Sequence, residues 1–194
     1  MKTASIPGRP PVALNDHARL FPPETTAAKA DYRPGDFLLT HGDATVDHLI
    51  QFGQRLRYDK AYCWFNHAVL VVGEAGDTVE AQAQGVIRSH IDHYAPGEYA
   101  IVNSGLSDAD RADAARFGQG MVGVPYGWVT DVSIGLTFLT GDTLRFSTGG
   151  TVICSGLVAA ALSLDEFRVD PSHVPPAGLA RHYDIRPPAQ LIAA

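Results

Sequence analysis

One uncharged stretch, TVICSGLVAAAL from Thr151 to Leu162, limits the possible folds of this chain more than any other. Beyond Cys154 its apolar residues have the spacing of a buried helix, so other elements have to cover it. The pattern places Cys154 at the N-terminus of that helix, where unpaired N–H groups and the macrodipole favour a thiolate. Because free cysteines are commonly small core residues, the rest of the chain decides whether Cys154 is a nucleophile.

Composition and charge exclude several classes of protein. The 194 residues suffice for one domain with a full core, and 15 basic against 21 acidic residues make a mildly negative globular protein. The basic residues form no cluster, so we expect no nucleic-acid partner. Two cysteines, Cys63 and Cys154, are too few for a disulfide framework, and no zinc-binding spacing of His, Glu or Cys occurs. We therefore expect no metal, no cofactor and a structural role for Cys63.

The N-terminal segment carries no secretion signal that we can identify, because Pro7, Pro10 and Pro11 interrupt it before any apolar run of suitable length. No uninterrupted apolar run is long enough to span a bilayer, so we expect no integral membrane contact. The default expectation is a cytoplasmic protein, and export without a cleavable signal is the alternative.

The remaining pattern predicts an α+β fold with a small, mostly antiparallel sheet. Strands are predicted at 37–40, 66–73, 78–83, 85–88 and 99–102, and helices at 44–57 and 107–121. Ser107 is the predicted N-cap of the second helix. The connection over 127–150 contains an apolar stretch, Val132 to Leu139, that fits a helix or a lid.

The strands at 66–73 and 78–83 form a predicted hairpin that supplies partners for a cysteine nucleophile. A cysteine needs a base, and the base needs a third polar group to hold its ring. His67 begins the first strand, whereas Glu80 and Gln82 share one face of the second. Either could orient His67. We prefer Glu80, because a carboxylate also stabilises the imidazolium.

Two sets of motifs then resemble a known family. The stretch Gly123–Trp128, followed by Ile153–Val158, is similar to the cysteine half of the NlpC-type papain-like hydrolases. The stretch Pro34–Leu38, followed by Asn66–Gly73 and Val79–Ala81, is similar to their histidine half. Here the histidine half comes first. This order resembles that of the circularly permuted branch of the family, which includes the YiiX-like and the lecithin:retinol acyltransferase-like proteins. The resemblance spans residues 32–165.

The resemblance implies a papain-like fold, with Cys154 as nucleophile, His67 as base and Glu80 as the third residue. It also implies that Tyr126 lies near the oxyanion, where its hydroxyl and the Cys154 N–H would donate. Trp128 lines an apolar substrate cleft or belongs to the core. Packing between helix and sheet is the alternative for Tyr126. The chain departs from the family in Ile153, where an aspartate often stands, and in the long loop before Cys154.

These expectations divide the chain into an extended N-terminal arm (1–30), a permuted papain-like catalytic domain (31–168) and a Pro-rich tail packed on that domain (169–194). We expect a cysteine-dependent hydrolase that cleaves a peptide or isopeptide amide bond through an acyl-enzyme. One alternative is an acyltransferase or thioesterase acting on fatty-acyl esters or amides, so the expected partner is a peptide-like or acyl-lipid substrate. A non-catalytic binding module on the same scaffold is the second alternative. Trp64 and Phe65 line an apolar cleft or belong to the core.

Overall fold

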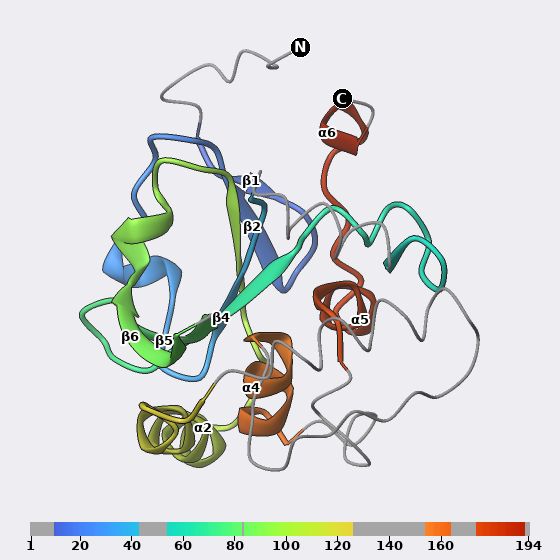
Figure 1. The fold of residues 1–194 in the computed structure, drawn as a ribbon. Coiled ribbons are helices and arrows are strands. Elements are labelled where there is room, and N and C mark those ends of the chain that lie inside the picture. The colour runs from blue at the N-terminus through green and yellow to red at the C-terminus, as the bar shows by residue number, and fades with distance from the viewer. Residues whose placement is uncertain (1–9, 43–53, 83, 126–153, 164–173, 193–194) are drawn as a thin grey trace.

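The computed structural model describes residues 10–42, 54–82, 84–125, 154–163 and 174–192. Within them the predicted α+β class is confirmed: one seven-stranded antiparallel sheet is packed against helices (Figure 1). The strand order is β1-β2-β7-β3-β4-β5-β6. In chain order the strands are β1 (Val12–Ala13), β2 (Ala18–Phe21), β3 (Phe37–Thr40), β4 (His67–Val71), β5 (Asp77–Gln82), β6 (Gly85–His90) and β7 (Tyr99–Val102).

The predicted hairpin is confirmed as β4 and β5, which pair antiparallel with Leu70 opposite Val79 and Val71 opposite Thr78. Its turn depends on Gly76, whose φ of 96° is a left-handed conformation that glycine adopts without strain. A Cβ at Gly76 would also lie 2.8 Å from Ile91 Cγ2. Gly76 therefore helps to fix the pairing register of β4 with β5, the two strands that carry His67 and Glu80.

Alternate residues of each strand divide the core between the two faces of the sheet. One face carries Leu39, Leu70 and Val79, and α2 (Asp108–Gly120), α4 (Cys154–Ala161) and α5 (Pro176–His182) lie over it (Figure 1). The opposite face carries residues such as Val71 and packs against Ile91 and Tyr94 of η2 (Ile91–Tyr94). Two further short helices are η1 (Lys29–Asp31) and α6 (Ala189–Ile192).

The helix predicted at 107–121 is confirmed as α2, with Ser107 as its N-cap. The Asp110 backbone N–H donates to Ser107 Oγ at 3.3 Å, and this hydroxyl donates to the Asp110 carboxylate at 2.6 Å. Asp108 and Asp110 in the first turn also complement the positive end of the macrodipole.

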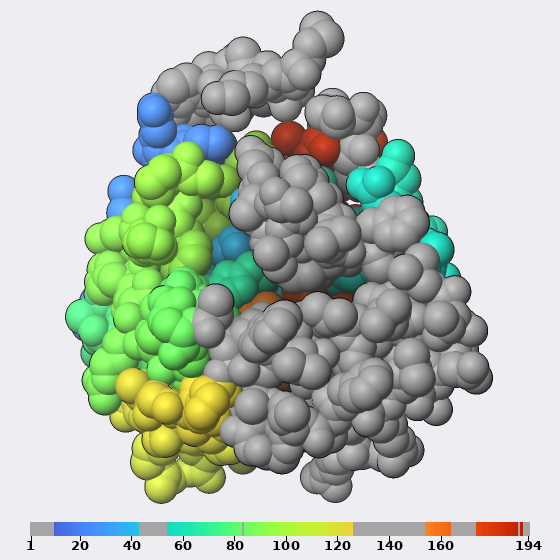
Figure 2. Space-filling view, viewed as in Figure 1, coloured from blue at the N-terminus to red at the C-terminus, as the bar shows by residue number. Residues whose placement is uncertain are grey.

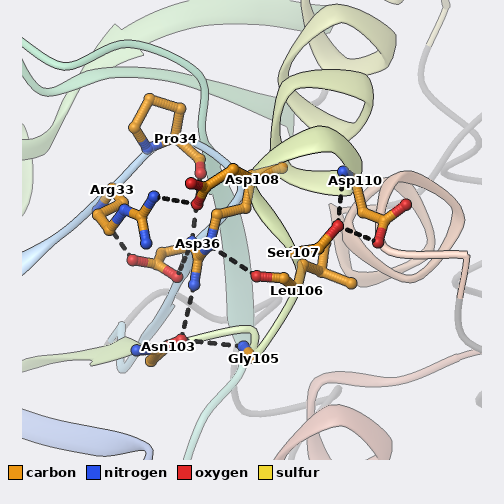
Figure 3. Close-up of polar contacts among 10 residues, drawn as sticks. Arg33, Pro34, Asp36, Asn103, Gly105, Leu106, Ser107, Asp108 and Asp110 are labelled. Carbon is orange, nitrogen blue, oxygen red and sulfur yellow. Dashed lines mark hydrogen bonds and ion pairs between the residues drawn. The ribbon is translucent and has the colours of Figure 1, made fainter.

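A buried ion pair fastens α2 to the sheet. Arg111 Nη1 donates to Asp36 Oδ1 at 2.6 Å, and both side chains are about 5% exposed or less (Figure 3). The other guanidinium donors reach Asn103 Oδ1 and the Leu106 carbonyl. The Asp36 carboxylate also accepts from the backbone N–H groups of Arg33 and Ser104. Every charge in this network therefore has a hydrogen-bonded partner, as burial requires.

The N-terminal segment, predicted as an extended arm, forms strands of the sheet, whereas the Pro-rich tail, predicted to be mostly extended, contains a buried helix. The segment expected as an arm contributes β1 and β2, and β2 pairs with β7 inside the sheet. The tail contains α5, in which Ala177 and Leu179 are fully buried. Pro176 stands in the first turn of α5, where its missing N–H costs no helical hydrogen bond. The two segments meet where Asn15 Nδ2 donates to the Tyr183 carbonyl at 2.8 Å.

Several predicted features lie outside the described residues. They are most of the helix expected at 44–57, the apolar stretch Val132 to Leu139, and the candidate substrate residues Tyr126 and Trp128.

Candidate functional site

His67 and Glu80, predicted as partners, are in direct contact. His67 is the first residue of β4, and Glu80 lies on β5. Because side chains alternate along a strand, His67 shares a face with Val71, and Glu80 shares a face with Thr78. Val71 pairs with Thr78, so His67 and Glu80 lie on the same face of the sheet. His67 Nε2 lies 2.7 Å from Glu80 Oε2. The Glu80 side chain is 1% exposed and that of His67 is 22% exposed. The carboxylate is thus sealed inside while one edge of the imidazole remains accessible.

Cys154 is the third member of this cluster and also interacts with His67. It is the first described residue of α4, which packs against β4, and it is 4% exposed. The Cys154 side chain lies close enough to His67 to raise the histidine pKa through its charge and a hydrogen bond. The three residues predicted from the sequence therefore lie together in the order Cys154, His67, Glu80.

His67 and Glu80 each stabilise the charged form of the other. Burial lowers the pKa of His67, but the charges and hydrogen bonds of Cys154 and Glu80 outweigh it and raise the pKa to about 10. Burial also raises the pKa of Glu80, but the hydrogen bond and charge of His67, with smaller contributions from Gln82 and Tyr94, lower it to about 2. Near neutral pH this arrangement favours an imidazolium beside an ionised carboxylate.

The sequence left open whether Glu80 or Gln82 orients His67, and the structure shows which of the two contacts it. Glu80 contacts His67, whereas the Gln82 side-chain carbonyl accepts from Gln84 Nε2 at 3.0 Å. Gln82 also lowers the pKa of Glu80. It therefore belongs to the surroundings of the carboxylate.

Neighbouring contacts hold the start of β4 in place. Thr40 on β3 pairs with His67, and the Asn66 backbone N–H donates to the Thr40 carbonyl at 3.1 Å. The Asn66 side chain accepts from the Gly42 N–H and donates to the Gly42 carbonyl. The backbone that carries His67 is thereby fastened to β3 and to the residues just after it.

The position of α4 depends on contacts with residues that precede and follow it in the chain. Ser155 Oγ donates to the Val174 carbonyl just before α5. Gln54 accepts from the Ala177 N–H at 2.6 Å and donates to the Phe65 carbonyl at 3.1 Å. In Figure 2 part of α4 is visible in a hollow beside the strands. The helix predicted to be buried is thus bonded to the segment just before α5 through Ser155, and α5 is bonded in turn to the segment before β4 through Gln54.

Trp64 and Phe65 belong to the core. They are 8% and 0% exposed and pack edge to face with ring centroids 4.9 Å apart. The residues before Tyr126 are described and lie against β6: the Val86 N–H donates to the Val124 carbonyl, and the Gly123 N–H donates to the Val86 carbonyl, each at 2.8 Å.

Cys63 differs from Cys154 in its surroundings. It is fully buried, its thiol lies 3.4 Å from the Asp59 carbonyl, and burial raises its pKa to about 11. Such a thiol is unreactive near neutral pH.

Tyr94 of η2 is the residue at this site that sequence reasoning missed. It interacts with Glu80 across the face opposite α4, and its side chain lowers the Glu80 pKa. Its segment, IDHY, has no periodicity or motif that would single out the tyrosine.

In the ranges that the structure describes, no group of three or more His, Cys, Asp or Glu side chains could hold a metal ion. No helix within those ranges is both long and apolar enough to cross a membrane.

Comparison with known proteins found no family model and no curated protein that matches the chain.

Proposed function

We propose that this protein is a cysteine-dependent hydrolase that cleaves an amide bond through an acyl-enzyme, on a permuted papain-like scaffold with Cys154 at the head of its helix. The observation that carries the proposal is the contact series from Cys154 to His67 to Glu80. A titratable cluster in which burial and specific partners shift the pKa values is typical of catalytic sites. The antiparallel sheet with the cysteine helix packed against it supports the same scaffold.

In the proposed reaction His67 accepts the Cys154 thiol proton, and the thiolate attacks the carbonyl carbon of the substrate. The tetrahedral intermediate collapses when the imidazolium donates its proton to the departing amine, which leaves a thioester on Cys154. His67 then takes a proton from water, whose oxygen attacks the thioester, and the acid departs as the thiol is restored. Glu80 holds the ring and stabilises its charged form throughout.

Burst kinetics test this proposal. With a p-nitrophenyl acyl ester, the protein should release about one equivalent of nitrophenolate rapidly, followed by slower turnover, because acylation of Cys154 precedes hydrolysis. Intact mass should show one acyl group attached, and Cys63→Ala should keep both burst and adduct. Absence of a burst together with absence of an adduct would contradict the proposal. Turnover of the ester without any turnover of a peptidyl p-nitroanilide would favour the acyl-ester alternative.

A further inference from the structure

Two buried oxygen atoms beside the His67–Glu80 pair have no hydrogen-bond partner in the described part of the chain. They are Oε1 of Glu80 and the hydroxyl of Tyr94. The other carboxylate oxygen of Glu80 is occupied by His67 at 2.7 Å. A buried ionised carboxylate needs donors for both of its oxygens, and a buried phenol needs an acceptor. The two atoms have complementary requirements.

These two side chains are also close enough to influence each other. Burial and the charge of Glu80 raise the pKa of Tyr94 well above its usual range. Ser89 on β6 lowers this pKa, but by less. The charge of Cys154 also raises the pKa of Tyr94, so the phenol lies within the electrostatic reach of the thiol. The Tyr94 hydroxyl therefore keeps its proton at any pH at which the protein works and is able to donate it in a hydrogen bond to an anion.

Tyr94 is carried on a fixed element. Ile91, at the start of η2, is 1% exposed, and its N–H donates to the Gly76 carbonyl at 2.9 Å. The His90 side chain caps η2 by accepting from the Asp92 N–H. The tyrosine thus approaches Glu80 from a short helix tied to the hairpin turn.

We infer that Tyr94 is a positioning residue whose hydroxyl donates to Oε1 of Glu80, so that a series of four side chains, Tyr94, Glu80, His67 and Cys154, orients the catalytic imidazole. A small movement of either side chain, or one bridging water, completes this bond. The inference rests on the proposed hydrolase function. The competing donor is Gln82, which also lowers the Glu80 pKa.

The substitution Tyr94→Phe removes the hydroxyl and keeps the ring. We expect the rate constant of the acylation burst to fall roughly tenfold, because a loosened Glu80 allows His67 to leave its working orientation. In a Glu80→Gln background the same substitution should cause no further loss, since Tyr94 acts through that carboxylate. An equal loss in both backgrounds would assign Tyr94 a general structural role and overturn the inference.

Two matched variants complete this test. Tyr99→Phe removes another buried hydroxyl of the same apolar cluster, one that donates to the Thr25 carbonyl, and should leave the burst unchanged. If Gln82→Leu slows the burst and Tyr94→Phe does not, Gln82 is the donor and the inference is wrong. Absence of a burst in the wild-type protein would instead contradict the proposed hydrolase itself.

A measurement on the wild-type fold covers the case in which Tyr94→Phe fails to fold. NMR of protein with labelled tyrosine should reveal a slowly exchanging Tyr94 hydroxyl proton, shifted downfield by its bond to the carboxylate. Glu80→Gln should move that resonance. A hydroxyl signal that is insensitive to Glu80→Gln would overturn the inference.

Discussion

Cys154→Ala should abolish the acyl-enzyme and reduce turnover to the uncatalysed background. Without the sulfur no covalent intermediate can form, and His67 and Glu80 have no nucleophile to activate. The substitution removes one atom from the first described residue of α4 and introduces a good helix former, so the fold should remain. Steady-state turnover, with circular dichroism as a check on folding, measures both effects.

Cys63→Ala is the matched control, because it makes the same chemical change at the other cysteine. Cys63 is fully buried, its thiol lies 3.4 Å from the Asp59 carbonyl, and burial raises its pKa to about 11. Turnover should therefore stay within about twofold of wild type. Full turnover in Cys154→Ala would contradict the proposed mechanism, whichever residue were then responsible.

Asp36→Ala should cause a large loss of stability. The Arg111 guanidinium, 5% exposed on its side chain, would lose its charged partner 2.6 Å away. Two backbone N–H groups, of Arg33 and Ser104, would lose their acceptor as well. Breaking a buried pair in this way costs about 3–5 kcal/mol in the free energy of unfolding. Urea denaturation followed by circular dichroism measures the change.

The matched control is Asp108→Ala, which removes an aspartate paired with Arg33 at the surface. Those two side chains are 86% and 58% exposed, so solvent screens the pair and its loss should change the unfolding free energy little. If Asp36→Ala were no more destabilising than Asp108→Ala, the buried network of Asp36 and Arg111 would not be what fastens α2 to the sheet. Figure 3 draws Asp36 and Asp108 together.

Local pattern was sufficient to predict the central hairpin and the helix α2. Alternating β-branched residues on both sides of a glycine turn specify β4 and β5, and Ser107 with two aspartates specifies the start of α2. Once the hairpin is known, period-two alternation places His67 and Glu80 on one face. The same alternation places Gln82 on that face as well, so the contact of Glu80 with His67 at 2.7 Å was not predictable from these local rules alone.

Features that depend on distant partners were not predictable in the same way. β2 is a strand because β7, some eighty residues later, offers it hydrogen bonds, and the prolines around it hide any strand pattern. α5 is only seven residues long and contains Pro176 and Gly178, so its burial against the core decides its conformation. Tyr94 reaches Glu80 only because η2 folds back over the sheet, which no spacing in the sequence reveals.

The most direct test of the central claim is the alkylation rate of Cys154 by iodoacetamide as a function of pH, followed by intact mass in a Cys63→Ala background. If His67 and Glu80 hold the thiol as a thiolate, labelling at pH 6 should be nearly as fast as at pH 9. In His67→Ala, labelling at pH 6 should fall by about two orders of magnitude, because an ordinary thiol with a pKa of about 8.5 is then almost fully protonated. His93→Ala, at an exposed histidine, should behave as wild type. If Cys154 labels only at alkaline pH, with or without His67, no thiolate–imidazolium pair exists and the proposed hydrolase is wrong.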